Sequence, residues 1–118
     1  MGTGLAEHAP LVDRVRAALT GEPSTREVPM FGGVSFMVND KMVVAVHHDG
    51  DLLVRVDPAR HSELLARPGA RPAEMGAGRT MGKGWIGVAA AQLATDHDVS
   101  VWVDEALAHN AQIVADSP

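Results

Sequence analysis

The alternation of apolar and polar side chains is densest between Met30 and Asp57. Three apolar runs follow one another in this stretch, and the residue pairs Asn39-Asp40 and Asp49-Gly50 separate them. Such pairs favour tight turns because asparagine, aspartate and glycine tolerate left-handed backbone conformations. The pattern therefore predicts a meander of three antiparallel strands joined by two hairpin turns.

The register of this meander assigns each side chain to one of two faces. If both turns contain two residues, Val38 opposes Lys41 and His48 opposes Asp51, and side chains alternate from there. The core face then carries Val34, Phe36, Val38, Val43, Ala45, Leu52, Val54 and Val56. The opposite face carries Ser35 and six residues that we predict as an interface: Met37, Met42, Val44, Val46, Leu53 and Arg55. Because this second face is still largely apolar, we expect another element, or a second copy of the chain in a homodimer, to cover it.

Helical periodicity and capping signals appear on both sides of the meander. The patterns predict helices at 11–20, 57–66 and 96–114, a short extended segment at 26–28, and short strands at 70–75 and 85–88. Asp57 before Pro58 is a typical helix start, and Pro72 confines its strand to a sheet edge. Because the strands follow one another directly, the predicted class is α+β with an antiparallel sheet flanked by N-terminal, middle and C-terminal helices. We expect one domain over residues 1–118, with a core at about 10–114.

Charge and composition narrow the possible partners. The 118 residues carry a net charge of −5 and no cysteine. An acidic chain is a poor ligand for a phosphate backbone, so direct nucleic-acid binding is not expected. The lack of cysteine excludes a disulfide framework and fits a reducing compartment. The sequence shows neither an apolar run of about 18 residues nor a signal peptide, so we expect a cytoplasmic protein without a membrane partner.

Catalytic and metal-binding motifs are missing from the sequence. His47 and His48 are adjacent in a strand end and point to opposite faces, and His97 lies between two acids that cap a helix. No nucleophile motif of the G-x-S-x-G type occurs. We therefore expect no metal, no cofactor and no enzymatic activity.

An alternative interpretation rests on the glycine-rich segment Gly76–Gly84. It differs from a phosphate-binding P-loop, because Ala77 stands where glycine is required and Gly84 where serine or threonine is required. The segment could still bind a small anion, or an enzyme substrate, together with Arg55, Arg79 and Lys83. Arg55 lies within a strand, where its charge must reach either water or a carboxylate of another element or subunit.

Several motifs in this order resemble one known family. MFGGVSFMVNDKMVVAV, DLLVRVDP, RPGARP, MGKGW and SVWVDEAL together resemble the N-terminal domain of the TfoX/Sxy family over roughly residues 10–112. The resemblance implies a compact α+β domain with a curved antiparallel sheet. It also implies a regulatory function, since TfoX/Sxy proteins regulate DNA-uptake competence genes together with an activator of the cyclic-AMP receptor type. A protein partner, such as a transcription regulator, follows from the resemblance, whereas catalytic residues do not.

Overall fold

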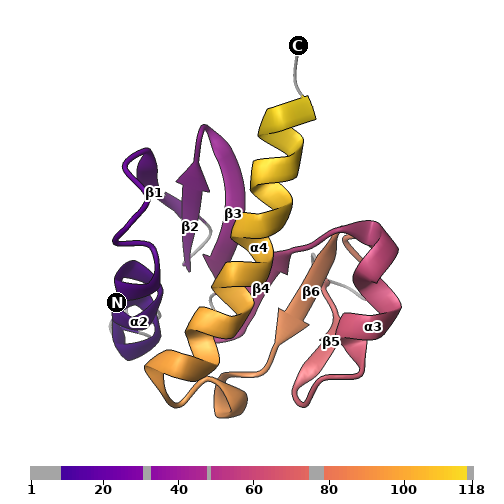
Figure 1. The fold of residues 1–118 in the computed structure, drawn as a ribbon. Helices are drawn as coiled ribbons and strands as arrows, with labels where there is room; N and C mark the ends of the chain where they lie inside the picture. The colour runs from indigo at the N-terminus through magenta and orange to yellow at the C-terminus, as the bar shows by residue number, and fades with distance from the viewer. Residues whose placement is uncertain (1–8, 31–32, 48, 75–78, 117–118) are drawn as a thin grey trace.

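Six strands form a single antiparallel sheet in the computed structural model, which describes residues 9–30, 33–47, 49–74 and 79–116 (Figure 1). The strand order is β1-β2-β3-β4-β6-β5. The bounds are β1 Thr25–Met30, β2 Gly33–Val38, β3 Lys41–Val46, β4 Leu52–Arg55, β5 Ala70–Pro72 and β6 Trp85–Val88. The predicted α+β class is confirmed. The meander is also present, and β6 lies between β4 and the edge strand β5.

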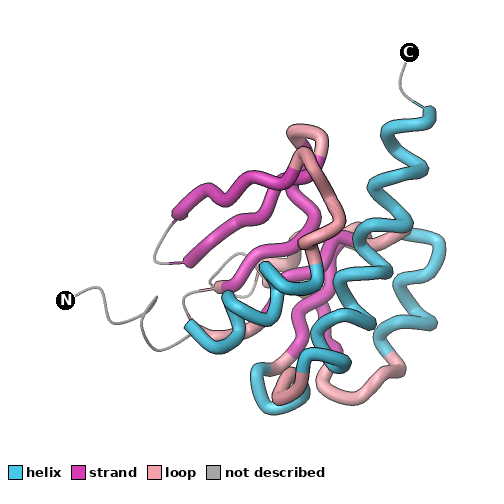
Figure 2. The backbone as a smooth tube through the Cα atoms, turned by 60° about the vertical axis from the view of Figure 1, so that its left-hand side comes forward, coloured by secondary structure: helices cyan, strands magenta, loops and turns pink. Residues whose placement is uncertain are grey.

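The helices gather on one face of this sheet. They are α2 (Ala9–Ala18), the short α3 (His61–Leu65) and the long α4 (Asp96–Asp116), with two 3-10 turns at Pro58–Arg60 and Ala90–Gln92. α4 packs on β3 and β4 and against α2, and Figure 2 shows the helices on the same side of the strands. The core lies between these layers, and Phe36, Leu52 and Ile86 are fully buried in it. No helix of the described residues is long and apolar enough to cross a membrane.

The turn between β2 and β3 has the two predicted residues, but the register beyond it differs from the prediction. Asn39 and Asp40 both have positive φ, 54° and 64°, as a type I′ turn requires. The pairing then shifts by one residue, so that Met37 opposes Met42 while Phe36 opposes Val44. The extra residue of β3 makes a β-bulge, a feature that alternation alone does not reveal.

This bulge reverses the predicted faces of β3 at Val44, Ala45 and Val46, whereas Met42 on the second face and Val43 in the core agree with the prediction. Val44 and Val46 point into the core opposite Phe36 and Val34, and they are 0% and 2% exposed. Their assignment to the second face, as interface residues, was therefore wrong. Ala45, predicted in the core, lies on the second face opposite Ser35.

The connection from β3 to β4 also differs from the predicted two-residue turn. The amide of His47 donates to the carbonyl of Asp51 over 2.8 Å, so His47 rather than His48 opposes Asp51. The loop between them has three residues, and Gly50 in it has a φ of 95°, which suits glycine. His48 itself lies outside the described residues.

The flanking elements agree with the sequence patterns to within a few residues. Asp57 accepts a hydrogen bond from the amide of Ala59 over 2.9 Å and caps the 3-10 turn that leads into α3. The predicted extended segment at 26–28 is longer than expected, because it forms the six-residue edge strand β1. Pro29 is tolerated there since an edge strand needs no ladder donor on its outer side. α4 begins after Thr95, whose side chain accepts from the amide of Asp98 over 3.1 Å.

Candidate functional site

The sheet face that points away from α4 carries most of the predicted interface, and we call it the second face. Cross-strand pairing places on it Arg26, Val28, Ser35, Met37, Met42, Ala45, Leu53, Arg55, Arg71, Trp85 and Gly87. Met37, Met42, Leu53 and Arg55 of the predicted interface are thus on one face and half-buried. Sequence reasoning missed Arg26 and Trp85, because cross-strand register decides their position.

One row of the second face combines cationic and apolar side chains. Arg26 opposes Met37 and Met37 opposes Met42; on the far side of the bulge, Arg55 opposes Trp85. We call these five residues the cation–methionine row. Four of them are half-buried and Arg26 is exposed.

The two arginines of this row differ in their ionic contacts. Six of the eight arginines lie within salt-bridge distance of a carboxylate, and Arg26 is one of them, 3.5 Å from Asp40. The described residues give no salt-bridge partner to Arg55, nor to Arg79, Lys83 or Lys41. Three of these four cations come from the end of β4 and from the loop before β6.

Backbone hydrogen bonds fix the loop before β6 beside β4. The amide of Val56 donates to the carbonyl of Gly84 over 2.9 Å, and the amide of Trp85 donates to Gly82 over 3.3 Å. Gly82 has a φ of 87°, a conformation that side chains rarely adopt. These contacts bring the loop that contains Lys83 next to the end of β4 that contains Arg55.

The middle of the second face is made of small residues. Ser35 and Ala45 oppose each other and are 2% and 7% exposed. The chain after β5 passes over Gly87, where an added Cβ would lie 3.7 Å from the Cα of Ala73. Among the described residues, the chain after β5 covers the second face over Gly87, whereas the side chains of the cation–methionine row remain half-buried or exposed.

A polar cleft opens beside the covered end. It has a volume of about 230 Å³ and is lined by His47, Asp49, Asp51, Leu53, Arg71, Ala73, Glu74 and Gly87. Arg71 forms an ion pair with Asp51, and Nδ1 of His47 lies 3.0 Å from Asp49. Among the described residues no group of three or more His, Cys, Asp or Glu side chains is placed to hold a metal ion.

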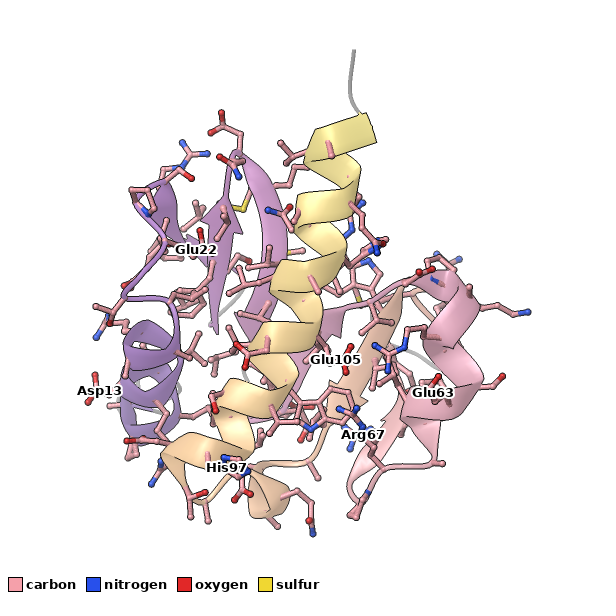
Figure 3. The ribbon with its side chains drawn as sticks, viewed as in Figure 1. Asp13, Glu22, Glu63, Arg67, His97 and Glu105 are labelled. Atoms are coloured by element: carbon pink, nitrogen blue, oxygen red, sulfur yellow. The ribbon has the colours of Figure 1, made fainter. Side chains whose placement is uncertain are left out.

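A second charged cluster joins the residues that flank α3 to α4. Arg67 donates to Glu105 over 3.0 Å and Arg60 donates to its other carboxylate oxygen, with Glu63 bonded to Arg60 at the exposed rim (Figure 3). The hydrogen bond from Arg60 lowers the pKa of Glu63. Arg67 also lies 5.2 Å from the ring centroid of Trp102. Because Glu105 accepts from two arginines, the cluster holds both ends of the α3 segment against α4. The arginines are 38 and 45 residues away from Glu105 in the chain, so local sequence patterns do not reveal the cluster.

The alternative anion site is only partly described. Arg79 and Lys83 are exposed in the loop before β6, and Arg55 is half-buried on the adjacent strand. Residues 76–78 of the predicted glycine-rich segment lie outside the described residues. The hydrogen bond from Val56 to Gly84 brings Lys83 beside the end of β4 that contains Arg55, whereas Arg79 precedes Thr80, which pairs with Glu74.

Comparison with known proteins identifies one family. A family model described as the TfoX N-terminal domain matches residues 17–110, from the end of α2 into α4. No curated protein and no solved structure matches the chain. The matched range contains the whole sheet and therefore the entire second face.

Proposed function

The chain belongs to the family of TfoX N-terminal domains, and from that premise we propose that it is a non-enzymatic interaction module that acts in regulation through protein contacts at its second face. The observation that carries this proposal is the half-exposed cation–methionine row. Apolar side chains on one face of a sheet favour a partner because their burial removes apolar area from water.

Capture from the native host tests this proposal. We expect the wild-type chain to retain a protein that Met37→Asp loses. Ala108→Asp is the matched control, because it adds the same charge at an exposed position of α4. Identical protein patterns for all three chains, with unchanged thermal melting, would contradict an interaction through the second face.

The homodimer expected from the sequence stays a prediction, which light scattering tests. A dimer at micromolar concentration that Met37→Asp dissociates would identify a second copy as the partner. A strict monomer at all micromolar concentrations would contradict the homodimer.

A second candidate function is binding of a small anion by Arg55, Arg79 and Lys83, as ligand or as substrate. The observation that favours it is the absence of carboxylate partners for these three cations among the described residues. A thermal-shift screen with nucleotides and phosphorylated metabolites tests it, since a ligand that binds the folded state raises the melting temperature. A rise that Lys83→Glu abolishes would favour this function over the interaction module.

A further inference from the structure

Resting on the interaction module proposed above, we infer that the cation–methionine row binds an acidic segment of a partner protein, one with bulky apolar residues between its acidic ones. Cations lie toward both ends of the row, Arg26 on β1 and Arg55 on β4, and Met37 and Met42 lie between them. A ligand that satisfies this order has carboxylates at its ends and apolar side chains in its middle.

The span of the row sets the length of that segment. It crosses five neighbouring strands, from β1 to β6. Strands are spaced about 4.8 Å apart, so the row is roughly 19 Å long. A helix of about 13 residues has this length at about 1.5 Å per residue.

The cations at the β4 end are free to accept a carboxylate. Arg55 is half-buried and has no salt-bridge partner among the described residues, and the loop carrying Lys83 is fastened beside it by the bond from Val56 to Gly84. A half-buried guanidinium is partly dehydrated before binding, so a carboxylate that reaches it meets little competing water. Arg26 at the other end has only an exposed contact of 3.5 Å with Asp40, which a ligand can replace.

The two methionines supply the apolar part of the surface. Met37 and Met42 oppose each other and are both half-buried. Methionine side chains are unbranched and flexible, so they adapt to leucine or phenylalanine side chains of different shape. Trp85 extends this surface beside Arg55.

Charge also favours an acidic segment over two other possible occupants of the row, a second copy of the chain and a nucleic acid. A second copy docked face to face by a two-fold axis that runs along the row would place the Arg55 side chains of the two copies against each other, which is a contact between like charges. A nucleic acid would be repelled by the net charge of −5 on the whole chain. A short acidic segment contacts the row alone, where the local charge is positive.

Titration with a synthetic peptide tests the inference. The probe is a 14-residue peptide with glutamates in its outer turns and leucine and phenylalanine in its middle, labelled for fluorescence anisotropy. We expect Arg55→Glu to raise the Kd about tenfold or more, because it replaces an attraction by a repulsion. Met42→Gln should raise the Kd without any change of charge. NMR shifts of the Met37 and Met42 methyl groups should locate the peptide on the row.

Lys41→Glu is the matched control for Arg55→Glu. Lys41 also lacks a salt-bridge partner among the described residues, but it is adjacent to Met42 in the same strand and therefore points to the other face. We expect the Kd of Lys41→Glu to stay within about twofold of wild type, because its side chain points away from the row and solvent ions screen its charge. Equal losses for the two variants, shifts confined to another surface, or equal affinity for a peptide with lysines in place of the glutamates would overturn the inference. So would tighter binding of a single-stranded oligonucleotide of the same charge, or a dimer that buries the row.

The two proposals can fail separately. If the peptide does not bind but Met37→Asp still loses a protein in the host capture, the interaction module stands and only the acidic partner is refuted. Melting curves of Arg55→Glu and Met42→Gln confirm that a loss of binding is not a loss of fold.

Discussion

Gly33 shows at the scale of one residue how closely β2 and β3 approach each other. A Cβ added to Gly33 would lie 2.1 Å from the carbonyl oxygen of Val46. Paired glycines such as those at 32–33 favour a bulge or a close backbone approach; such an approach occurs at Gly33, whereas Gly32 lies outside the described residues. The sequence could suggest the approach because glycine alone permits it.

Gly33→Ala should destabilise the fold by about 2–4 kcal/mol, since a backbone oxygen cannot move aside without shifting a strand. Urea unfolding measures this change. Gly84→Ala is the control, because an added Cβ there has nothing within 4 Å. Its effect should stay within about 0.5 kcal/mol. Similar values for the two variants would show that the strands can separate at Gly33 without loss.

At the scale of elements, the hairpins show which features of register a sequence can reveal. The turn at Asn39-Asp40 was predicted correctly because its residues favour positive φ. The bulge in β3 and the third residue of the next loop were not predicted, since neither changes the apolar pattern. Each shifts the register by one residue, and the two shifts cancel in β4. Leu52 and Val54 were therefore placed correctly in the core while Val44 and Val46 were not.

The positive φ of Asp40 gives a prediction for the first hairpin. Asp40→Gly should be more stable than Asp40→Ala by about 1 kcal/mol, because alanine is strained in the left-handed region and glycine is not. Both variants remove the same carboxylate and its contact with Arg26, so the comparison isolates the backbone. Thermal or urea unfolding measures the difference.

The same two substitutions at Asp104 provide a control, in which the stability difference between the glycine and alanine variants should have the opposite sign. Asp104 is exposed within α4, and glycine there should be less stable than alanine by about 1 kcal/mol. Equal stability of Asp40→Gly and Asp40→Ala would mean that the turn relaxes away from the type I′ conformation.

At the scale of the whole molecule, the class of fold and most core residues followed from the sequence, whereas long-range contacts did not. The position of β6 between β4 and β5 and the cluster around Glu105 join segments far apart in the chain. The periodic pattern of apolar residues within one segment carries no information about which distant segment it contacts. Candidate residues of the second face were found where the alternation held, as at Met37 and Leu53, and missed where pairing with a distant strand decides the face, as at Trp85.

The contact between the N-terminal helix and the sheet edge makes stability depend on pH. Nε and Nη2 of Arg16 in α2 donate to the two oxygens of Glu27 in β1 over 2.6 and 2.9 Å. These hydrogen bonds hold the pKa of Glu27 below its ordinary value of 4.5. A carboxyl whose pKa is lower in the folded state stabilises the fold above its unfolded pKa, and this stabilisation is lost as the pH falls through the folded value.

Glu27→Gln should therefore lower the free energy of unfolding at pH 7, by less than about 1 kcal/mol because the pair is partly exposed to water. The difference from wild type should shrink as the pH falls below 4.5 and vanish once Glu27 is protonated in the folded protein. A double-mutant cycle with Arg16→Gln, measured by urea unfolding at pH 7 and pH 3, separates this pair from the contact of Arg16 with Asp13. A coupling energy that is the same at both pH values would contradict the ionic origin of the contact. A coupling that disappears at pH 3 would show that protonation of one carboxyl removes the ionic contact between α2 and the edge strand.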